Sequence, residues 1–239
     1  NFTVFTYASA KGNAKLPPQM KNESECNYDA SLIWPAGSTL LDETLKKTIK
    51  EMLNIKSPET DPLKFLTGTK NNVIAAWKKD NASLSPKDTK DLGLSLSYEE
   101  VHNIELMYEN ERLLTLSHFI SLYTGGAHNS YSRQLSCFDK HSGKQLKIGD
   151  VVTSAGLKAL PGLLDQIARI QFGITNKKPL EENGFLVNVI QPSKNFYVTE
   201  SGIGFIYAPY EVKSFSEGEV TIIVPFKAIN TYLTPGFKK

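Results

Sequence analysis

The 239-residue sequence lacks most of the features by which common protein classes are recognised. It contains two cysteines, Cys26 and Cys137, which are too few for a disulfide scaffold and have no Cys-x-x-Cys or Cys-His spacing for zinc. One disulfide between them and two free thiols are both open. We expect buried thiols, because each cysteine lies among apolar residues of a predicted strand. The core must then come from side-chain packing, for which the chain is long enough.

Long apolar runs and blocks of one charge are also lacking. No apolar segment reaches the ~20 residues that cross a bilayer, and no basic and then apolar signal sequence opens the chain. The 27 lysines and arginines are scattered among 25 acidic residues rather than gathered in a basic stripe. We therefore expect no membrane span and no nucleic-acid partner.

The composition is that of an ordinary soluble globular protein. Hydrophobic residues make up 40% of the chain and charged residues 22%, close to the averages for folded domains. The chain begins at Asn1 in a strand-like stretch, as a chain trimmed of a targeting segment would. No cofactor-binding motif is recognisable, so we expect no cofactor.

The first third of the sequence indicates one strand followed by helices. Residues 25–35 form the predicted strand, and a helix capped by Ser38 follows through Leu53. Further helices begin at Asp61-Pro62 and, for a short one, at Ser85-Pro86. A capping side chain followed by proline is typical of a helix start.

After Gly93 the apolar period changes from helical to alternating, which predicts a meander of strands. The phase changes at Glu99-Glu100, so we expect a bulge there. The clearest alternation belongs to one strand, whose predicted core face carries Leu114, Leu116, His118, Ile120 and Leu122. Since leucines flank His118, we expect it to be a hydrogen-bonded core histidine.

The rest of the chain mixes strands and helices. The predicted elements are strands over 131–138 and 146–148, a helix over 150–174 that restarts or kinks at Pro161, a hairpin over 196–207, a strand over 220–224 and a short final helix. Since this order does not alternate as βαβ units do, we predict an α+β fold with mostly antiparallel sheets and two intertwined lobes. A boundary near Asp91-Gly93 separates a helix-rich N-terminal domain over 1–92 from a C-terminal α+β domain over 93–239.

The segment from Tyr123 to Asn129 is the most unusual in the chain. Gly125 and Gly126 permit positive φ and a close approach of another backbone, and His128 supplies a titratable group. The segment is either a recognition loop, an acid-base or metal site, or a hairpin turn whose histidine satisfies backbone groups. The turn is the more common of these structures.

Motifs for catalysis and metal binding are lacking elsewhere. His102, His118, His128 and His141 have no spacing that pairs them as metal ligands, and His141 lies in a predicted, solvated turn. There is no Gly-x-Ser-x-Gly elbow and no phosphate-binding glycine loop. We therefore predict no metal site and no catalytic residue, while an active site assembled from distant residues stays open.

Residues 203–212 alternate aromatic side chains and then meet Pro209. Aromatic residues beside a glycine turn can form a binding platform for carbohydrate or protein, although more often they close a core. Together with the glycine-rich segment they make up our predicted ligand site, which consists of Tyr123, Gly125, Gly126, His128, Asn129, Tyr207 and Tyr210.

These two stretches, together with the segment Asp139-Lys-His-Ser-Gly-Lys-Gln-Leu-Lys-Ile-Gly-Asp150, resemble a bacterial domain family of unknown function. The family is the C-terminal domain of RsiV-type anti-sigma factors, and it also occurs beside polysaccharide deacetylase domains. The resemblance runs from about Leu94 to Phe226. The helix-rich first third resembles the partner domain that commonly precedes it.

The resemblance implies an extracytoplasmic location, periplasmic or on a surface lipoprotein. RsiV-type members bind lysozyme, and the deacetylase members act on cell-wall glycan through a different domain, so no catalytic residue carries over. We therefore expect a binding module for a cell-envelope glycan or a lysozyme-like protein. The alternatives are a cell-envelope hydrolase or deacetylase-like enzyme that uses His128, and a purely architectural lipoprotein domain.

Overall fold

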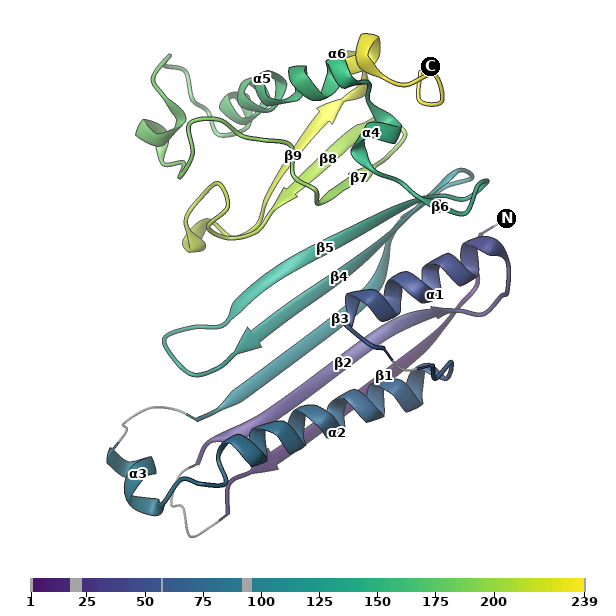
Figure 1. Cartoon of the computed structure of the whole chain (residues 1–239). Helices are drawn as coiled ribbons and strands as arrows, with labels where there is room; N and C mark the ends of the chain where they lie inside the picture. Colours follow the sequence, from purple (N-terminus) through teal and green to yellow (C-terminus); the bar gives the residue numbers. More distant parts are fainter. Residues whose placement is uncertain (1, 18–22, 57, 92–95, 239) are drawn as a thin grey trace. The chain divides into compact units, whose positions relative to one another are not determined.

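The computed structural model describes residues 2–17, 23–56, 58–91 and 96–238 and confirms the predicted α+β fold (Figure 1). Its elements follow in the order β1 (Phe5–Lys15), β2 (Glu25–Pro35), α1 (Leu40–Met52), α2 (Pro62–Asp80), α3 (Pro86–Asp91), β3 (Tyr98–Glu109), β4 (Leu113–Tyr123), β5 (Ser130–Asp139), β6 (Lys144–Gln145), α4 (Ile148–Val151), α5 (Ser154–Gln171), β7 (Phe196–Val198), β8 (Gly202–Tyr207), β9 (Val220–Pro225) and α6 (Phe226–Ile229). Short 3₁₀ helices lie at Leu180–Asn183, Phe215–Glu217 and Asn230–Tyr232.

The strands form two sheets. Their orders are β1-β2-β3-β4-β5-β6 and β7-β8-β9. The pairs β1–β2, β5–β6, β7–β8 and β8–β9 are antiparallel, whereas β2–β3 is parallel. A parallel pair needs a long crossover connection, and the segment that carries α1, α2 and α3 supplies it.

The chain divides into two compact units whose segments alternate along the sequence. Unit 1 combines Asn1–Phe2 and Leu106–Ser117 with Ser132–Lys239, and unit 2 combines Thr3–Glu105 with His118–Tyr131. The boundary predicted near Asp91-Gly93 falls at residues 92–95, which lie outside the described residues, and unit 2 contains segments from both sides of it.

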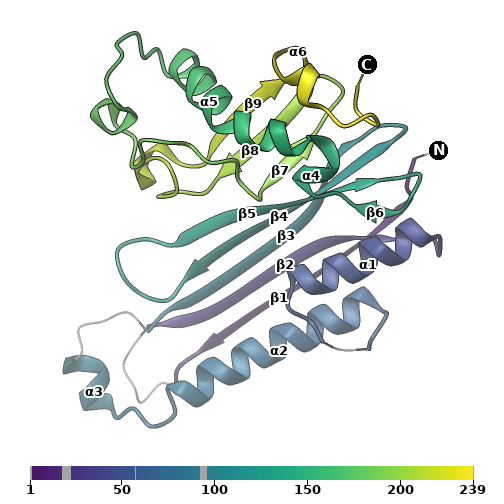
Figure 2. The same ribbon diagram turned by 45° about the horizontal axis from the view of Figure 1, so that its top comes forward.

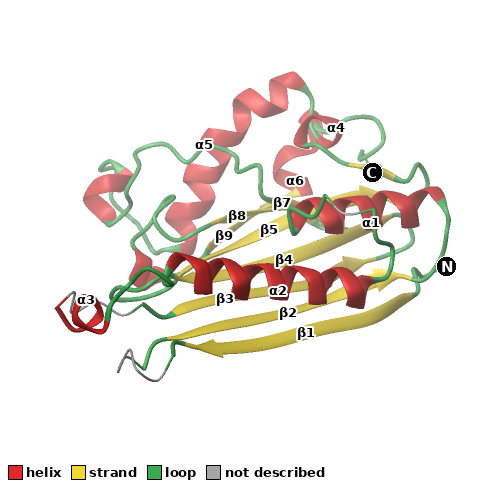
Figure 3. Cartoon of the chain, turned by 60° about the horizontal axis from the view of Figure 1, so that its bottom comes forward, coloured by secondary structure: helices red, strands yellow, loops and turns green. Residues whose placement is uncertain are grey.

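In unit 2, β1 and β2 pair along their whole length, from Phe5 with Pro35 to Lys15 with Glu25. The even-numbered residues of β2 are buried, and α1 and α2 lie along that side of the sheet, which we call the covered face (Figure 3). The odd-numbered residues of β1 and β2 point to the other side, which we call the open face. The predicted strand over 25–35 is confirmed.

Capping side chains begin both long helices of unit 2. The Thr39 hydroxyl accepts a hydrogen bond from the Asp42 backbone N–H, and the Asp42 carboxylate accepts one from the Thr39 N–H. The predicted cap at Ser38 is therefore wrong by one residue, because Thr39 completes the reciprocal capping box. At the start of α2 the Asp61 carboxylate accepts from the Leu63 N–H, as predicted.

β3 pairs with β2 without the bulge expected at Glu99-Glu100. Seven consecutive residues of β3, from Tyr98 to Ile104, oppose seven consecutive residues of β2. The alternation therefore continues through Glu100, which is a polar residue in the apolar phase rather than a change of phase. Gly93 and Leu94, where the meander was expected to begin, lie outside the described residues.

β4 is buried on both faces along its first half. Leu114, Leu116 and His118 have no exposed surface, which confirms this part of the predicted core face, whereas Ile120 and Leu122 are half-buried. Thr115 and Ser117 have no exposed surface either. Because Thr115 and Ser117 are polar, the alternation along β4 predicts that only the leucine face is buried. The burial of the threonine and serine face is not visible in the sequence pattern.

In unit 1, α5 packs against the three-stranded sheet (Figure 2). The β7–β8 hairpin and strand β9 confirm the predictions. The strand predicted over 146–148 is wrong, because Ile148 begins α4. The helix predicted over 150–174 is split, because Val152 is extended and pairs with Leu233, while Pro161 lies inside α5. No helix in the described ranges is long and apolar enough to cross a membrane.

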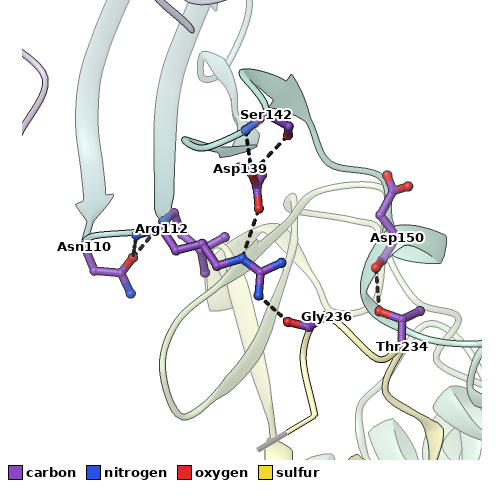
Figure 4. Close-up of polar contacts among 8 residues, drawn as sticks. Asn110, Arg112, Asp139, Ser142, Asp150, Thr234 and Gly236 are labelled. Atoms are coloured by element: carbon purple, nitrogen blue, oxygen red, sulfur yellow. Dashed lines mark hydrogen bonds and ion pairs between the residues drawn. The ribbon is translucent and has the colours of Figure 1, made fainter.

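Arg112, in the turn between β3 and β4, holds the C-terminal segment of unit 1 (Figure 4). Its Nε donates to Oδ2 of Asp139 over 3.0 Å, and its Nη1 donates to the carbonyl oxygen of Gly236. The guanidinium carbon lies 4.3 Å from the centre of the Phe237 ring. The Asn110 side chain accepts from the Arg112 backbone N–H and closes the turn.

Replacing Arg112 by alanine should lower the free energy of unfolding of unit 1 by about 1–2 kcal/mol, because an ion pair, a backbone hydrogen bond and a cation–π contact are lost together. Lys178→Ala is the control, since Lys178 forms an exposed ion pair with Glu182 in unit 1, worth about 0.3–0.5 kcal/mol. Urea denaturation followed by circular dichroism measures both losses. Equal losses of unfolding free energy in the two variants would contradict the conclusion that Arg112 holds the C-terminal segment of unit 1.

Candidate functional site

The predicted glycine-rich segment is a hairpin end between β4 and β5 in unit 2. Gly125 and Gly126 have φ values of 88° and 114°, which favour glycine. The Tyr123 hydroxyl donates to the carbonyl oxygen of Gly126 over 3.0 Å. A ring nitrogen of the exposed His128 lies 2.8 Å from the carbonyl oxygen of Asn129. The structure thus brings five of the predicted site residues into one hairpin, which its own hydrogen bonds help to hold.

The other two predicted site residues lie in unit 1 and differ in exposure. Tyr207 is 4% exposed, and its hydroxyl donates to the carbonyl oxygen of Gln191 over 2.8 Å. Tyr210 is 60% exposed, has a φ of 71°, and its ring centre lies 5.8 Å from that of Phe215. Tyr207 is therefore a core residue of unit 1, and Tyr210 offers its ring to solvent.

A chain of four polar side chains lies on the covered face of unit 2, and we call it the histidine chain. The Tyr98 hydroxyl donates to Oε2 of Glu100 over 2.5 Å, and Oε1 of Glu100 lies 2.7 Å from Nε2 of His102. Nδ1 of His102 lies 2.9 Å from Nε2 of His118. The expected hydrogen-bonded core histidine at 118 is confirmed.

The electrostatics of the histidine chain favour one charge pattern at neutral pH. Burial opposes ionisation of Glu100, but the hydrogen bonds from His102 and Tyr98 hold its pKa below the ordinary value. Burial and the neighbouring His102 lower the pKa of His118 to about 3. Glu100 is therefore an anion and His118 a neutral imidazole at pH 7.

The histidine chain does not have the geometry of a catalytic base. A general base must come within hydrogen-bond reach of its substrate. His118, at the end of the chain, has no exposed surface, so no substrate contacts it in this conformation. In the described part of the chain, no group of three or more His, Cys, Asp or Glu side chains is arranged to hold a metal ion, and Cys26 and Cys137 are free and buried.

Sequence reasoning missed the pairing of His102 with His118. The two residues lie 16 positions apart, and their contact depends on how β3 and β4 are aligned. The available signal was local: Glu100 and His102 are two residues apart in one strand, so their side chains share a face.

The open face of unit 2 carries rows of polar side chains. Three neighbouring rows, each with one residue from β1, β2 and β3, are Ser9/Ser31/Asn103, Lys11/Asp29/Val101 and Asn13/Asn27/Glu99. Strands in a sheet lie ~4.8 Å apart, and residues two apart in a strand repeat every ~6.7 Å. The rows therefore form a regular grid in which every position except Val101 carries a hydrogen-bonding side chain.

Two of these rows surround a shallow hollow of about 460 Å³. Within it, Nζ of Lys11 lies 2.7 Å from Oδ2 of Asp29, and the side-chain amide of Asn13 donates to Oδ1 of Asn27 over 2.6 Å. The hydrogen bond with Asp29 raises the pKa of Lys11, so Lys11 remains a cation at neutral pH. The hollow is thus polar: Lys11 and Asp29 form an ion pair, and the carboxylate of Glu99 adds one more acidic group.

Aromatic side chains of β4 and β5 extend the open face. Because His118 lies on the covered face, the alternation of β4 puts Phe119, Ser121 and Tyr123 on the open face. The Tyr131 ring centre lies 6.1 Å from that of Phe119, and the Asn129 amide donates to the Ser121 hydroxyl over 2.6 Å. We call Phe119, Tyr123 and Tyr131 the aromatic strip. The polar grid and the aromatic strip make up the candidate ligand surface, which includes the predicted site residues Tyr123 and Asn129.

Substituting Gly126 by alanine tests the hairpin geometry, and the same substitution at Gly68 in α2 is the comparison. Neither Gly126 nor Gly68 in α2 has any atom within 4 Å of an added Cβ. Gly126→Ala should lower the free energy of unfolding by about 1 kcal/mol because of its φ of 114°. Gly68→Ala should raise it by about 0.5–1 kcal/mol through helix propensity. Urea denaturation followed by tryptophan fluorescence measures both, and changes of the same sign would contradict this account.

Comparison with known proteins identifies a family for part of the chain. Residues 150–227, about a third of the chain, match the family described as "Protein of unknown function (DUF3298)". No curated protein matches the chain. A domain of unknown function is what the sequence resemblance implied, while the RsiV type and the partner domain stay predictions.

Two solved structures are similar over nearly the whole chain. A member of the DUF3298 family from Bacteroides fragilis has 23% identity and a TM-score of 0.86, and the match covers 97% of this chain and 94% of that chain. A DUF3298 family protein from Pseudomonas aeruginosa has 14% identity and a TM-score of 0.64, with 98% and 97% covered. At these identities the likeness is one of fold.

Proposed function

We propose that this protein is an extracytoplasmic binding module and that the open face of unit 2 binds a cell-envelope glycan. The observation that carries the proposal is the polar grid beside an aromatic strip on one sheet face. The proposed location rests on the resemblance of the sequence to extracytoplasmic RsiV-type domains. The proposed ligand rests on the chemistry of the surface.

The polar grid suits a ligand with many hydroxyl groups. A hydroxyl both donates and accepts hydrogen bonds, and the grid offers amide groups at Asn13, Asn27 and Asn103. The N–H groups of Asn13 already bind Glu25 and Asn27, so Asn13 offers its oxygen as an acceptor. The carboxylate of Glu99, which is exposed, accepts from hydroxyls. Because one lysine faces two carboxylates around the hollow, the surface disfavours nucleic acid and other polyanions, and it lacks the concentrated charge that would bind a polycation.

The aromatic strip supplies the apolar part of such a surface. Sugar rings present C–H groups on their faces, and an aromatic ring buries this apolar area while hydroxyls at the ring edge reach polar neighbours. β3 and β4 run antiparallel from the turn at Asn110, so residues before His102 lie near residues after His118. Glu99 and Tyr123 are therefore at the same end of unit 2, beside the Asn13/Asn27/Glu99 row.

The alternatives predict other surfaces. A hydrolase that uses His128 needs a site that encloses its substrate beside the ring, whereas His128 is exposed on a hairpin end. A purely architectural domain has no use for a polar hollow on an open sheet face. A lysozyme-like protein partner would bury a larger and more apolar area.

Asn13→Ala and Tyr123→Ala should each weaken glycan binding about five- to tenfold, a loss of about 1–1.4 kcal/mol per contact. Asn72→Ala and Leu63→Ala, at exposed positions of α2 on the other side of the sheet, are matched controls that should leave the affinity unchanged. Calorimetric titration with soluble muropeptides and, separately, with lysozyme measures all five proteins, wild type included.

Three outcomes decide this proposal. Heat with muropeptides that falls only in Asn13→Ala and Tyr123→Ala supports it. Heat with lysozyme alone moves the partner to a protein, and an unchanged affinity in both open-face variants moves the surface elsewhere. Each of the last two results overturns the assignment.

A further inference from the structure

The histidine chain ends at a buried nitrogen without a partner. Among the described residues, Nδ1 of His118 has no hydrogen-bond partner, and the His118 side chain has no exposed surface. Unpartnered buried polar atoms are costly and uncommon in folded proteins. The side chains of Glu100 and His102, closer to solvent, are 18% and 12% exposed. The cost at His118 is therefore borne deep in unit 2.

Hydrogen-bond geometry limits how many protons the chain holds. Nε2 of His102 must donate to the Glu100 carboxylate, which only accepts. One hydrogen then joins the two histidines: either neutral His102 accepts from His118, or cationic His102 donates to it. In both cases His118 is neutral. A second added proton would place two N–H groups against each other across 2.9 Å and two cations side by side.

The groups around the histidine chain do not relieve this constraint. On β2, the ring centre of Tyr28 lies 6.1 Å from that of His102. Burial and the charge of Glu100 raise the pKa of the neighbouring Cys26 thiol. On α2, the positive charge of Lys78 partly offsets this rise in the pKa of Cys26. The buried carboxylate of α1, Asp42, is bound to its capping residue. In the described ranges the one carboxylate in contact with the histidines is thus Glu100.

We propose that the Glu100–His102–His118 chain is an acid-sensitive device that loosens unit 2 when the surroundings become acidic. Folded unit 2 has room for one extra proton in the chain and excludes the next, whereas an unfolded His118 accepts a proton freely. Acid therefore pulls the equilibrium toward the open state. This device lies on the covered face and does not depend on the ligand proposed for the open face.

The sign follows from proton linkage. The pKa of His118 is about 3 in the folded chain and about 6.5 in an unfolded one, so above pH 6.5 neither state binds the proton. As the pH falls from 6.5 toward 3, the unfolded state alone binds it, and stability falls. The unfolding equilibrium constant should rise on the order of ten- to a hundredfold between pH 7.5 and 4.5 from this residue. Glu100, with its lowered pKa, acts in the same direction at lower pH.

Tryptophan fluorescence measures the opening of unit 2 selectively. The chain has two tryptophans, Trp34 and Trp77, and both are buried in unit 2. Urea denaturation of the whole chain, repeated from pH 7.5 to 4.5, gives the pH dependence of the unfolding constant. The variant His118→Gln removes the titrating ring, and His141→Gln, at an exposed turn residue, is the matched control.

The wild type and His141→Gln should show the same steep rise of the unfolding constant between pH 7.5 and 4.5. In His118→Gln this rise should be at least tenfold smaller. A lower stability of His118→Gln at every pH is a packing effect and leaves the slope as the readout. If His118→Gln does not fold, His118→Leu, which matches the neighbouring leucines of β4, replaces it. Slopes for the His118 variant and the wild type that agree within twofold overturn the proposal.

Discussion

The hydrogen bond between His102 and His118 fixes which side chains of β3 and β4 face the helices of unit 2 and which face away. Because strands alternate, placing these histidines on the covered face sends Glu99, Phe119 and Tyr123 to the open face. A shift of one residue in either strand would exchange the faces. One buried polar contact therefore defines both the acid-sensitive interior and the proposed ligand surface.

Much of the fold was predictable from local signals. The strand over 25–35, the start of α2 at Asp61-Pro62, the β7–β8 hairpin and the core position of His118 follow from alternation, capping and turn chemistry. The errors have specific causes. Val152 is extended because it pairs with the distant Leu233, and the parallel pairing of β2 with β3 depends on a crossover of more than sixty residues, which no local pattern encodes.

The candidate site was predictable only in part. The hairpin from Tyr123 to Asn129 was recognisable because two adjacent glycines indicate positive φ. The polar grid was not, because Asn13, Asn27 and Glu99 become neighbours through two strand registers, and each alone resembles an ordinary surface residue. The histidine chain was hidden for the same reason. Alternation also predicted that Tyr207 lies in a strand, but it did not indicate that the strand face carrying Tyr207 is buried.

The most direct test of the account is nitrogen-15 NMR of the four histidine rings as the pH is lowered. The account predicts that His118 keeps the shifts of a neutral imidazole down to about pH 4, with one ring nitrogen bonded to His102. Titration of His118 near pH 6.5 in the folded protein, with unit 2 intact, would contradict both the buried contact and what has been built on it.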